Sequence, residues 1–250
     1  MKAMILAAGR GTRLKPVTDS KPKALLEIGG RTLLEIQIRK LLKAGIKEII
    51  INVHHFADQI EQYLHEKHAF GASISISDER EELLDTGGGI RKASWFFNNS
   101  KTFLVQNVDV ITDLDLADFV DAYMAKNADV LLAVRKRTSG RQLLFNKKMQ
   151  LKGWQNLKEN KCLLVEVNSH AEDFEQYAFS GIHLIRSSLA GKFAESPHSI
   201  IRTYLQLASE HEIHGYDHTG TRWWDIGKYE ELEDLKRDPE LLKIIKKNDG

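Results

Sequence analysis

The sequence predicts an α/β fold, a Rossmann-like three-layer sandwich with a mixed, mostly parallel sheet and a small antiparallel portion. Two patterns favour this class. Through about residue 135, short apolar runs typical of buried strands alternate with stretches of helical periodicity. Such alternation predicts βαβ units, a mostly parallel sheet and right-handed crossovers. Beyond that point short strand-like runs are separated by polar turns, which predicts the antiparallel portion.

The first half is expected to alternate strands and helices. Strands are expected at 3–8, 48–53, 73–77, 102–106 and 129–134. Helices are expected at 32–44, 56–67, 84–97 and 116–126. The first of these helices has an apolar face of leucine and isoleucine, and Gly45 follows it as a C-terminal cap. The run at 48–53 is rich in β-branched residues, which indicates a buried strand.

The second half is expected to add shorter strands and a helical tail. Strands are expected at 143–145, 149–154, 162–165, 177–185 and 211–216. Helices are expected at 187–194, 197–209 and 228–247. The last helix should be interrupted at Pro239, because proline lacks the amide hydrogen that a helix interior uses.

Composition excludes several classes of protein. The chain has 250 residues with 42% hydrophobic and 28% charged residues, as expected of a globular domain. The formal net charge of +1 gives no bulk attraction to nucleic acid or to a membrane surface. The single cysteine, Cys162, excludes an internal disulfide framework. No apolar run reaches about 18 residues, the length that a membrane-spanning helix needs. We therefore expect a cytoplasmic protein without nucleic-acid or membrane partners.

The loop after the first strand has the residues of a phosphate cradle. Gly9 and Gly11 follow the apolar run, and glycine lets backbone N–H groups approach a ligand closely. Four cations lie within the next few positions, namely Arg13, Lys15, Lys21 and Lys23. A strand end, glycines and clustered cations together predict a triphosphate site. The simpler alternative for the glycine pair is an ordinary turn.

The common phosphate-loop motifs do not match this segment. The loop lacks the third glycine of G-x-G-x-x-G and contains no G-K-[ST]. The whole string instead resembles the signature of sugar-1-phosphate nucleotidylyltransferases, L-A-A-G-x-G-x-R-[LM]-x-P-[LV]-T followed by P-K-x-L. The matching residues are Leu6, Ala7, Ala8, Gly9, Gly11, Thr12, Arg13, Leu14, Pro16, Val17, Thr18, Pro22, Lys23 and Leu25.

Two carboxylates are candidates for holding magnesium. Asp109 follows the strand at 102–106, and a carboxylate beside a triphosphate site is a typical magnesium ligand. Asp225 in Trp224-Asp225-Ile226-Gly227 is the second candidate. The alternatives are a turn residue at Asp109 and a helix cap at Asp225. The resemblance implies the metal role, because the family has an aspartate after its central strand and another in a late D-[IV]-G segment. Val108 departs from the family, which usually has glycine there.

The resemblance also implies an architecture and a reaction. It implies the nucleotide-diphospho-sugar transferase fold over a single domain, 1–250. Within it, 1–135 would bind nucleotide, 136–227 would bind the sugar phosphate, and 228–250 would form C-terminal helices. The reaction would transfer a nucleoside monophosphate from a nucleoside triphosphate to a sugar 1-phosphate and release pyrophosphate, with Mg²⁺ as cofactor.

Individual site residues follow from the matching motifs. Arg13 and Lys23 are the expected catalytic residues. The expected nucleotide-binding residues are Leu6, Ala8, Gly9, Gly11, Thr12, Arg13, Thr86, Gly87 and Gly88. The expected sugar-phosphate-binding residues are Asn107, Trp154, Asn156 and Gly181. Trp154 in Gly153-Trp154-Gln155-Asn156 resembles the G-W-x-N of the N-acetylmuramic acid 1-phosphate uridylyltransferase branch, and a core position is the equal alternative.

The sequence allows more than one substrate and more than one assembly. UTP is the favoured donor, and the alternatives are guanylyl transfer to mannose- or heptose-type 1-phosphates and cytidylyl transfer to another phosphorylated substrate. A non-catalytic sugar-nucleotide-binding subunit could keep the glycines but would not need both aspartates. A dinucleotide-dependent oxidoreductase would require the missing third glycine. The sequence does not determine the oligomeric state, and a homodimer is one option.

Overall fold

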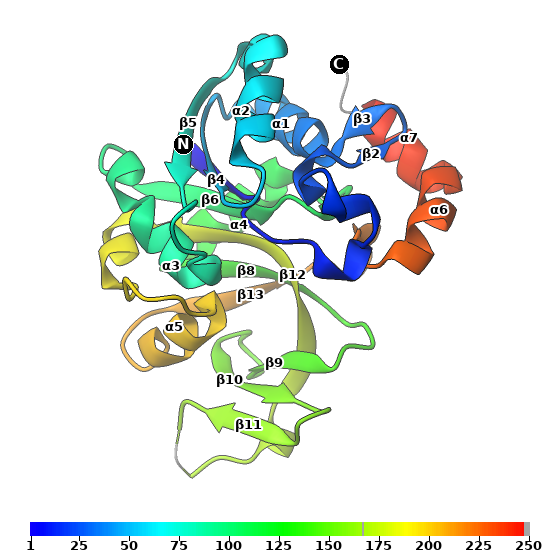
Figure 1. The fold of residues 1–250 in the computed structure, drawn as a ribbon. Helices are drawn as coiled ribbons and strands as arrows, with labels where there is room; N and C mark the ends of the chain where they lie inside the picture. The colour runs from blue at the N-terminus through cyan, green and yellow to red at the C-terminus, as the bar shows by residue number, and fades with distance from the viewer. Residues whose placement is uncertain (167, 248–250) are drawn as a thin grey trace.

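A ten-stranded mixed sheet crosses the molecule in the computed structural model, which describes residues 1–166 and 168–247 (Figure 1). The main strand order is β11-β10-β9-β12-β6-β1-β4-β5, and β8 pairs with both β12 and β13. The parallel strands at one end are β1 (Lys2–Leu6), β4 (Glu48–Val53), β5 (Ser73–Asp78) and β6 (Thr102–Asn107). The other strands are β8 (Val130–Arg135), β9 (Arg141–Phe145), β10 (Leu151–Asn156), β11 (Lys161–Leu164), β12 (Glu175–Arg186) and β13 (Ile213–Asp217).

Helices cover both faces of this sheet, which confirms the predicted three-layer α/β class. One face carries α1 (Leu33–Lys43), α2 (Ala57–Glu66), α4 (Leu116–Lys126), α6 (Tyr229–Arg237) and α7 (Pro239–Lys247). The other carries α3 (Asp85–Lys92), α5 (Ile200–Leu207) and the 3₁₀ segments Ser94–Phe97 and Ser187–Lys192. The alternation of side chains along β1 divides it between the two layers, because Ala3 and Ile5 enter one core and Met4 the other.

The antiparallel portion is continuous with the parallel sheet. The twelve-residue β12 joins the two, because residues 182–186 pair with β6 and residues 175–177 pair with β9. The register of β12 against β8 shifts between Phe179 and His183. Such an irregularity bends a strand. A single long, bent strand therefore carries the antiparallel extension, defined here as β9, β10 and β11.

Three predicted helices differ from the structure. The helix expected at 84–97 is divided into α3, which ends at Lys92, and the 3₁₀ segment Ser94–Phe97. The segment at 187–194 contains only the 3₁₀ segment Ser187–Lys192, and the helix expected at 197–209 begins at Ile200. The later start has a local cause, because the preceding backbone is bonded to α3. Gly87 donates its N–H to the carbonyl of His198, and Ile200 donates its N–H to Thr86 Oγ1, both at 2.9 Å.

Two small antiparallel pairs were not predicted. They are β7 (Val110–Thr112) with β14 (Trp223–Asp225), and β2 (Glu27–Ile28) with β3 (Arg31–Thr32). Strands of two or three residues carry too little periodicity to be recognised in sequence. The first pair matters for function, because it brings a segment near the end of the chain alongside the segment that follows β6.

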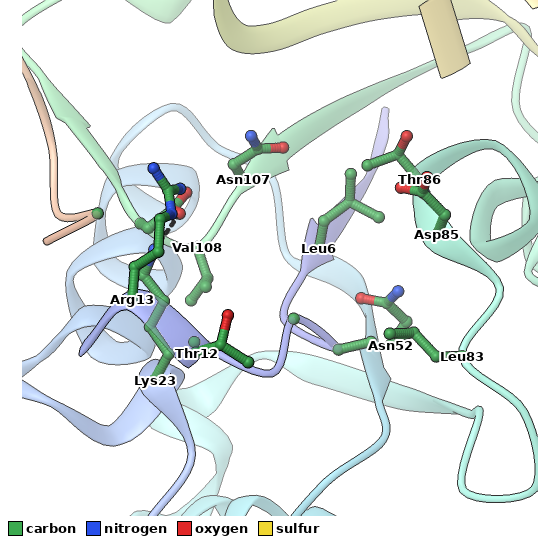
Figure 2. A pocket seen from close by; sticks show the side chains of 15 residues that line it. Leu6, Thr12, Arg13, Lys23, Asn52, Leu83, Asp85, Thr86, Asn107 and Val108 are labelled. Atoms are coloured by element: carbon green, nitrogen blue, oxygen red, sulfur yellow. Dashed lines mark hydrogen bonds and ion pairs between the residues drawn. The ribbon is translucent and has the colours of Figure 1, made fainter. Parts of the chain in front are cut away.

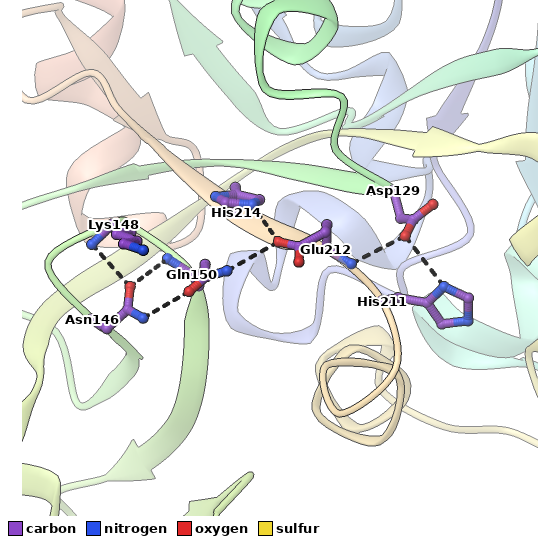
Figure 3. Close-up of polar contacts among 7 residues, drawn as sticks. All are labelled: Asp129, Asn146, Lys148, Gln150, His211, Glu212 and His214. Carbon is purple, nitrogen blue, oxygen red and sulfur yellow. Dashed lines mark hydrogen bonds and ion pairs between the residues drawn. The ribbon is translucent and has the colours of Figure 1, made fainter.

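A polar network joins β13 to the start of the extension (Figure 3). Glu212 accepts a hydrogen bond from Gln150 Nε2 at 3.1 Å and contacts His214 Nε2 at 2.9 Å. The backbone N–H of Glu212 donates to Asp129 at 3.0 Å. Asn146 accepts from the N–H of Gln150 in the turn between β9 and β10. These bonds fix the position of the extension relative to the parallel sheet.

Among the residues that the structure describes, no helix combines the length and apolar character that crossing a membrane requires. The expected division into halves at residues 135 and 227 stays a prediction.

Candidate active site

A cavity of about 440 Å³ lies beyond the carboxyl ends of β1 and β6. This is where parallel α/β sheets bind ligands. Its lining contains most of the residues predicted for nucleotide, metal and catalysis. These are Leu6, Ala8, Gly9, Gly11, Thr12, Arg13, Lys23, Thr86 and Asp109, and the lining also contains Asn107 from the predicted sugar-phosphate residues. Figure 2 shows Arg13 and Lys23 on one side of the cavity, with Asp85 and Thr86 across from them.

The glycine loop is held in a defined shape by its own backbone. Gly11 has φ of +62°, a left-handed conformation that disfavours other residues. Its carbonyl accepts hydrogen bonds from Leu14 N–H at 2.8 Å and from Thr18 Oγ1 at 2.9 Å. A Cβ at Gly11 would lie 3.0 Å from the methyl group of Thr18. The turn leads into the 3₁₀ segment Thr12–Leu14, which places Thr12 and Arg13 at the cavity.

Lys23 and Asp109 form an ion pair at the cavity wall. The lysine side chain is 9% exposed and the aspartate side chain 22%. A charge held this far from water is normally paired, and the pair satisfies both groups. Val108, beside Asp109, is buried in the core and also lines the cavity. The side chain that replaces the usual glycine of the family therefore contributes to the cavity wall.

Asp225 is brought beside Asp109 by the pairing of β14 with β7. Asp225 lies opposite Val110, and Ile226 donates its N–H to the carbonyl of Asp109 at 2.9 Å. Desolvation and, next, the neighbouring Asp109 carboxylate raise the pKa of Asp225. The charges of Lys23, Arg13 and Arg137 act in the opposite direction. The structure thus brings the two predicted metal ligands together from positions more than a hundred residues apart.

The donor set at this point fits a magnesium ion shared with substrate. Within residues 1–166 and 168–247, no group of three or more histidine, cysteine, aspartate and glutamate side chains could hold a metal. Two carboxylates, Asp109 and Asp225, are the number that magnesium commonly takes from a protein when phosphate oxygens and water complete its octahedron. The mutual repulsion of two adjacent carboxylates is also what a divalent cation would relieve.

Sequence reasoning missed a buried polar relay behind the cavity. Asn52 lines the cavity and accepts the N–H of Ala7 at 2.7 Å. Its Nδ2 donates to Glu79 at 2.8 Å, and the other oxygen of Glu79 accepts from Leu84 N–H at 3.1 Å. Glu79 is 0% exposed, and burial raises its pKa. The relay joins the start of the glycine loop to the segment before α3. Its one sequence signal was an asparagine inside the apolar run at 48–53.

The glycines of α3 have a packing role. A Cβ at Gly87 would lie 2.2 Å from the ring of His198, and one at Gly88 would lie 3.0 Å from the carbonyl of Ser196. The Gly87 N–H is already bonded to the backbone of His198. The cavity lining contains Asp85 and Thr86 but neither glycine. The glycines therefore let the segment around Ser196 approach α3, and their predicted contact with nucleotide stays a prediction.

The predicted sugar residues divide into two groups. Asn107 lines the cavity. Gly181, with φ of +77°, packs against the Asn107 side chain, and a Cβ at Gly181 would lie 2.9 Å from Asn107 Nδ2. Trp154 packs against the apolar core on the α3 and α5 face, as the alternative interpretation allowed. Asn156 is buried, and its Oδ1 accepts the N–H groups of Lys158 and Glu159 in the turn after β10. Neither Trp154 nor Asn156 belongs to the cavity lining.

Comparison with known proteins agrees with this arrangement. Residues 2–142 match the model of the nucleotidyl transferase family. The chain is 30% identical over 235 residues to an N-acetylmuramate alpha-1-phosphate uridylyltransferase of Caulobacter vibrioides, covering 90% of this chain and 91% of that one. It is 45% identical over 115 residues to the protein of that name from Neisseria meningitidis serogroup B, covering 46% of this chain and 49% of the relative.

A solved structure shares the fold over nearly its whole length. HddC from Yersinia pseudotuberculosis superposes with a TM-score of 0.74 at 21% identity, covering 94% of this chain and 98% of that chain. The inositol-1-phosphate CTP transferase from T. maritima also gives a TM-score of 0.74, at 16% identity. From the family match and the full-length relative, the chain belongs to the nucleotidyl transferase family of enzymes.

Proposed function

We propose that this enzyme transfers a uridylyl group from UTP to a sugar 1-phosphate, and that its acceptor is N-acetylmuramic acid 1-phosphate. The main supporting observation is one cavity lined by a glycine loop, two cations and the Asp109 carboxylate, with Asp225 beside Asp109. Those groups suit a triphosphate and a metal. The products would be a UDP-sugar and pyrophosphate.

The chemical step needs little proton transfer. An oxygen of the acceptor phosphate attacks the α-phosphorus of UTP, and the bond from that phosphorus to the bridging oxygen of the β-phosphate breaks. A phosphate monoester has a second pKa near 6 and is largely ionised at neutral pH, so the nucleophile requires no general base. The main barrier is repulsion between two anions, which fixed positive charges lower.

Arg13 and Lys23 are placed to supply those charges. The guanidinium of Arg13 can donate two parallel hydrogen bonds to the departing pyrophosphate. Lys23 offers a point charge to the α-phosphate and is oriented by its ion pair with Asp109. Asp109 and Asp225 would hold Mg²⁺, which supplies neutralisation of the triphosphate charge when it is bound.

The choice of substrate draws on the relatives. The relative that aligns with about nine-tenths of this chain acts, by its name, on N-acetylmuramate alpha-1-phosphate with a uridylyl donor. The second candidate is guanylyl transfer to mannose 1-phosphate. The mannose-1-phosphate guanyltransferase of Gibberella zeae is 27% identical over 91% of this chain, but the aligned region spans 61% of that protein's length. We therefore place it second.

A matrix of reactions tests the proposal. Purified enzyme with Mg²⁺ is given each of UTP, GTP, CTP and ATP with 1-phosphates of N-acetylmuramic acid, N-acetylglucosamine, glucose, mannose and heptose, and pyrophosphate release is measured. Asp109→Asn serves as the blank. We expect the highest kcat/KM for UTP with N-acetylmuramic acid 1-phosphate. A better donor than UTP, or no turnover of that acceptor, would contradict the substrate assignment while leaving nucleotidyl transfer intact.

A further inference from the structure

Two arginines lie beside the active site without an assigned role. Arg135 ends β8, Arg137 follows two residues later, and both side chains reach the ring of Trp223. The guanidinium carbon of Arg137 lies 4.5 Å from the centroid of the Trp223 ring, and that of Arg135 lies 5.8 Å from it. Trp223 thus contacts two cations at once.

Neither guanidinium has a carboxylate partner among the residues that the structure describes. Arg135 Nε and Nη1 and Arg137 Nε are buried without a hydrogen-bond partner there. Their other protein contacts are long, at 3.4 Å to the carbonyls of Thr219 and Phe179. Burial lowers the pKa of Arg137, the nearby Asp225 carboxylate acts in the opposite direction, and the charge of Arg135 again lowers it. Two like charges at one indole cost free energy that an anionic ligand would offset.

Sheet topology places this pair at the edge that binds substrate. Strand β12 runs antiparallel to both β6 and β8, so β6 and β8 point the same way and their carboxyl ends share an edge. Trp223 donates its indole N–H to the carbonyl of Ser180 at 3.1 Å, next to Gly181, which lies against Asn107 of the cavity. The charge of Arg137 also acts on Asp225. The pair of arginines is therefore near Asp225, at the same edge of the sheet as the cavity.

We propose that Arg137, assisted by Arg135 and backed by Trp223, binds an oxyanion of the acceptor sugar. Guanidinium forks bind phosphate and carboxylate groups in bidentate fashion, so the shared chemistry is a phosphate or a carboxylate of that substrate. The inference rests on the proposed function, since it requires a phosphorylated acceptor. It assigns acceptor recognition to β8 and β14, outside the antiparallel extension.

The test compares neighbouring variants. Arg137→Gln removes the charge, and Arg137→Lys keeps the charge but loses the fork. Lys136→Gln is the matched control, because Lys136 lies between the two arginines in the sequence but is exposed and pairs with Glu175 at 3.3 Å. We expect Arg137→Gln to raise the acceptor KM by about 10- to 100-fold, the scale of losing a charged hydrogen bond. Arg137→Lys should be intermediate, and Lys136→Gln should match the wild type.

Two acceptors identify which oxyanion is bound. N-acetylmuramic acid 1-phosphate carries a carboxylate in addition to its phosphate, and N-acetylglucosamine 1-phosphate carries the phosphate alone. An equal fold-increase in KM for both acceptors assigns the phosphate to Arg137. An increase for the muramic acid substrate alone assigns the carboxylate.

The outcome is independent of which sugar the enzyme prefers. If the matrix above selects a different donor or acceptor, the same variants are measured with that pair, and only the substrate assignment fails. If no acceptor is turned over, inorganic phosphate is titrated by tryptophan fluorescence, with Trp223→Phe as the spectroscopic control. A saturable fluorescence change that Arg137→Gln loses would support the site. No change in the wild-type protein would overturn the proposal. An acceptor KM within twofold of wild type in Arg137→Gln, or a parallel rise in the nucleotide KM, also overturns the proposal. A fall in Tm without either change would mean that the arginines only pack against Trp223.

Discussion

The parallel part of the sheet and the antiparallel extension differ in how strand direction positions side chains. In the parallel part, β1, β4 and β6 end at one edge, so residues after each strand meet in a single cavity. In the extension, β9, β10 and β11 run in alternating directions, so successive strands end at opposite edges. A motif after a parallel strand can be assigned to the binding edge from topology alone. A motif on an antiparallel strand, such as Gly153-Trp154-Gln155-Asn156, cannot. Variants in the two regions should therefore affect different properties, catalysis in the parallel part and stability in the extension.

The largest effect should come from the carboxylates of the parallel edge. Asp109→Asn keeps the shape but removes the charge that faces Lys23 and Asp225, and we expect kcat to fall by about 100- to 1,000-fold. Excess EDTA should abolish turnover, and Mg²⁺ should restore it. Asp121→Asn, at an exposed position of α4, is the control. Activity that persists in EDTA would contradict the metal role.

The cations of the glycine loop should come next. Arg13→Ala should lower kcat by roughly a hundredfold if the guanidinium acts mainly on the leaving pyrophosphate. Lys15→Ala removes an equal charge two residues away, but Lys15 is exposed, pairs with Asp19 at 3.0 Å and lies outside the cavity lining. It should leave kcat unchanged. A rise confined to the nucleotide KM in Arg13→Ala would make Arg13 a binding residue only.

Gly87 and Gly9 differ in surroundings, because Gly87 is packed against His198 and Gly9 lines the cavity. Gly87→Ala should lower Tm, because its Cβ would overlap the His198 ring and overpacking costs about 1 to 3 kcal/mol. Gly9→Ala meets no atom within 4 Å, so Tm should hold. Because Gly9 lines the cavity, its new methyl group should instead raise the nucleotide KM several-fold. The reverse pattern would mean that Gly87 contacts the nucleotide.

The extension supplies a smaller, structural effect. Asn156→Ala removes two hydrogen bonds that shape the turn after β10, so we expect a loss of about 1 kcal/mol and a Tm lower by about 2 to 4 °C. The acceptor KM should not change. Lys158→Ala, in the same turn and exposed, controls for surface effects. A higher acceptor KM at unchanged Tm would instead establish Asn156 as the sugar-binding residue that the sequence motif indicated.

The last effect is absent at neutral pH and grows only on acidification, and it concerns His183 in β12, the strand shared by both regions. Burial lowers the pKa of His183 to about 3, whereas an unfolded histidine titrates near 6.5. Between these pH values the unfolded state binds more protons than the folded state. The contribution of His183 to the free energy of unfolding is therefore fully present above pH 6.5 and is lost as the pH falls toward 3. His183→Phe should flatten the decline of Tm between pH 6.5 and 4, while His65→Phe on the exposed side of α2 should not. Equal slopes in both variants would contradict the prediction.

Much of the site followed from local sequence. The glycine loop and the aspartate after β6 were predictable because each lies at the end of an apolar strand, and parallel strands share their carboxyl edge. The α/β class followed from the periodicity of the same segments. These inferences need only the chain near each motif and one topological rule.

Tertiary structure decided the rest. Asp225 lies beside Asp109 because the short strands β7 and β14 pair. The hydrogen bonds from Ala7 to Glu79 pass through the buried Asn52. The contact of Arg137 with Trp223 depends on the direction of β8. Trp154 and Asn156 lie outside the cavity, because Trp154 packs against the apolar core and Asn156 bonds the turn after β10. Local sequence specifies which strand ends carry reactive groups. Which distant residues join them was set by long-range packing, because pairings between segments a hundred residues apart leave no periodic trace in the chain.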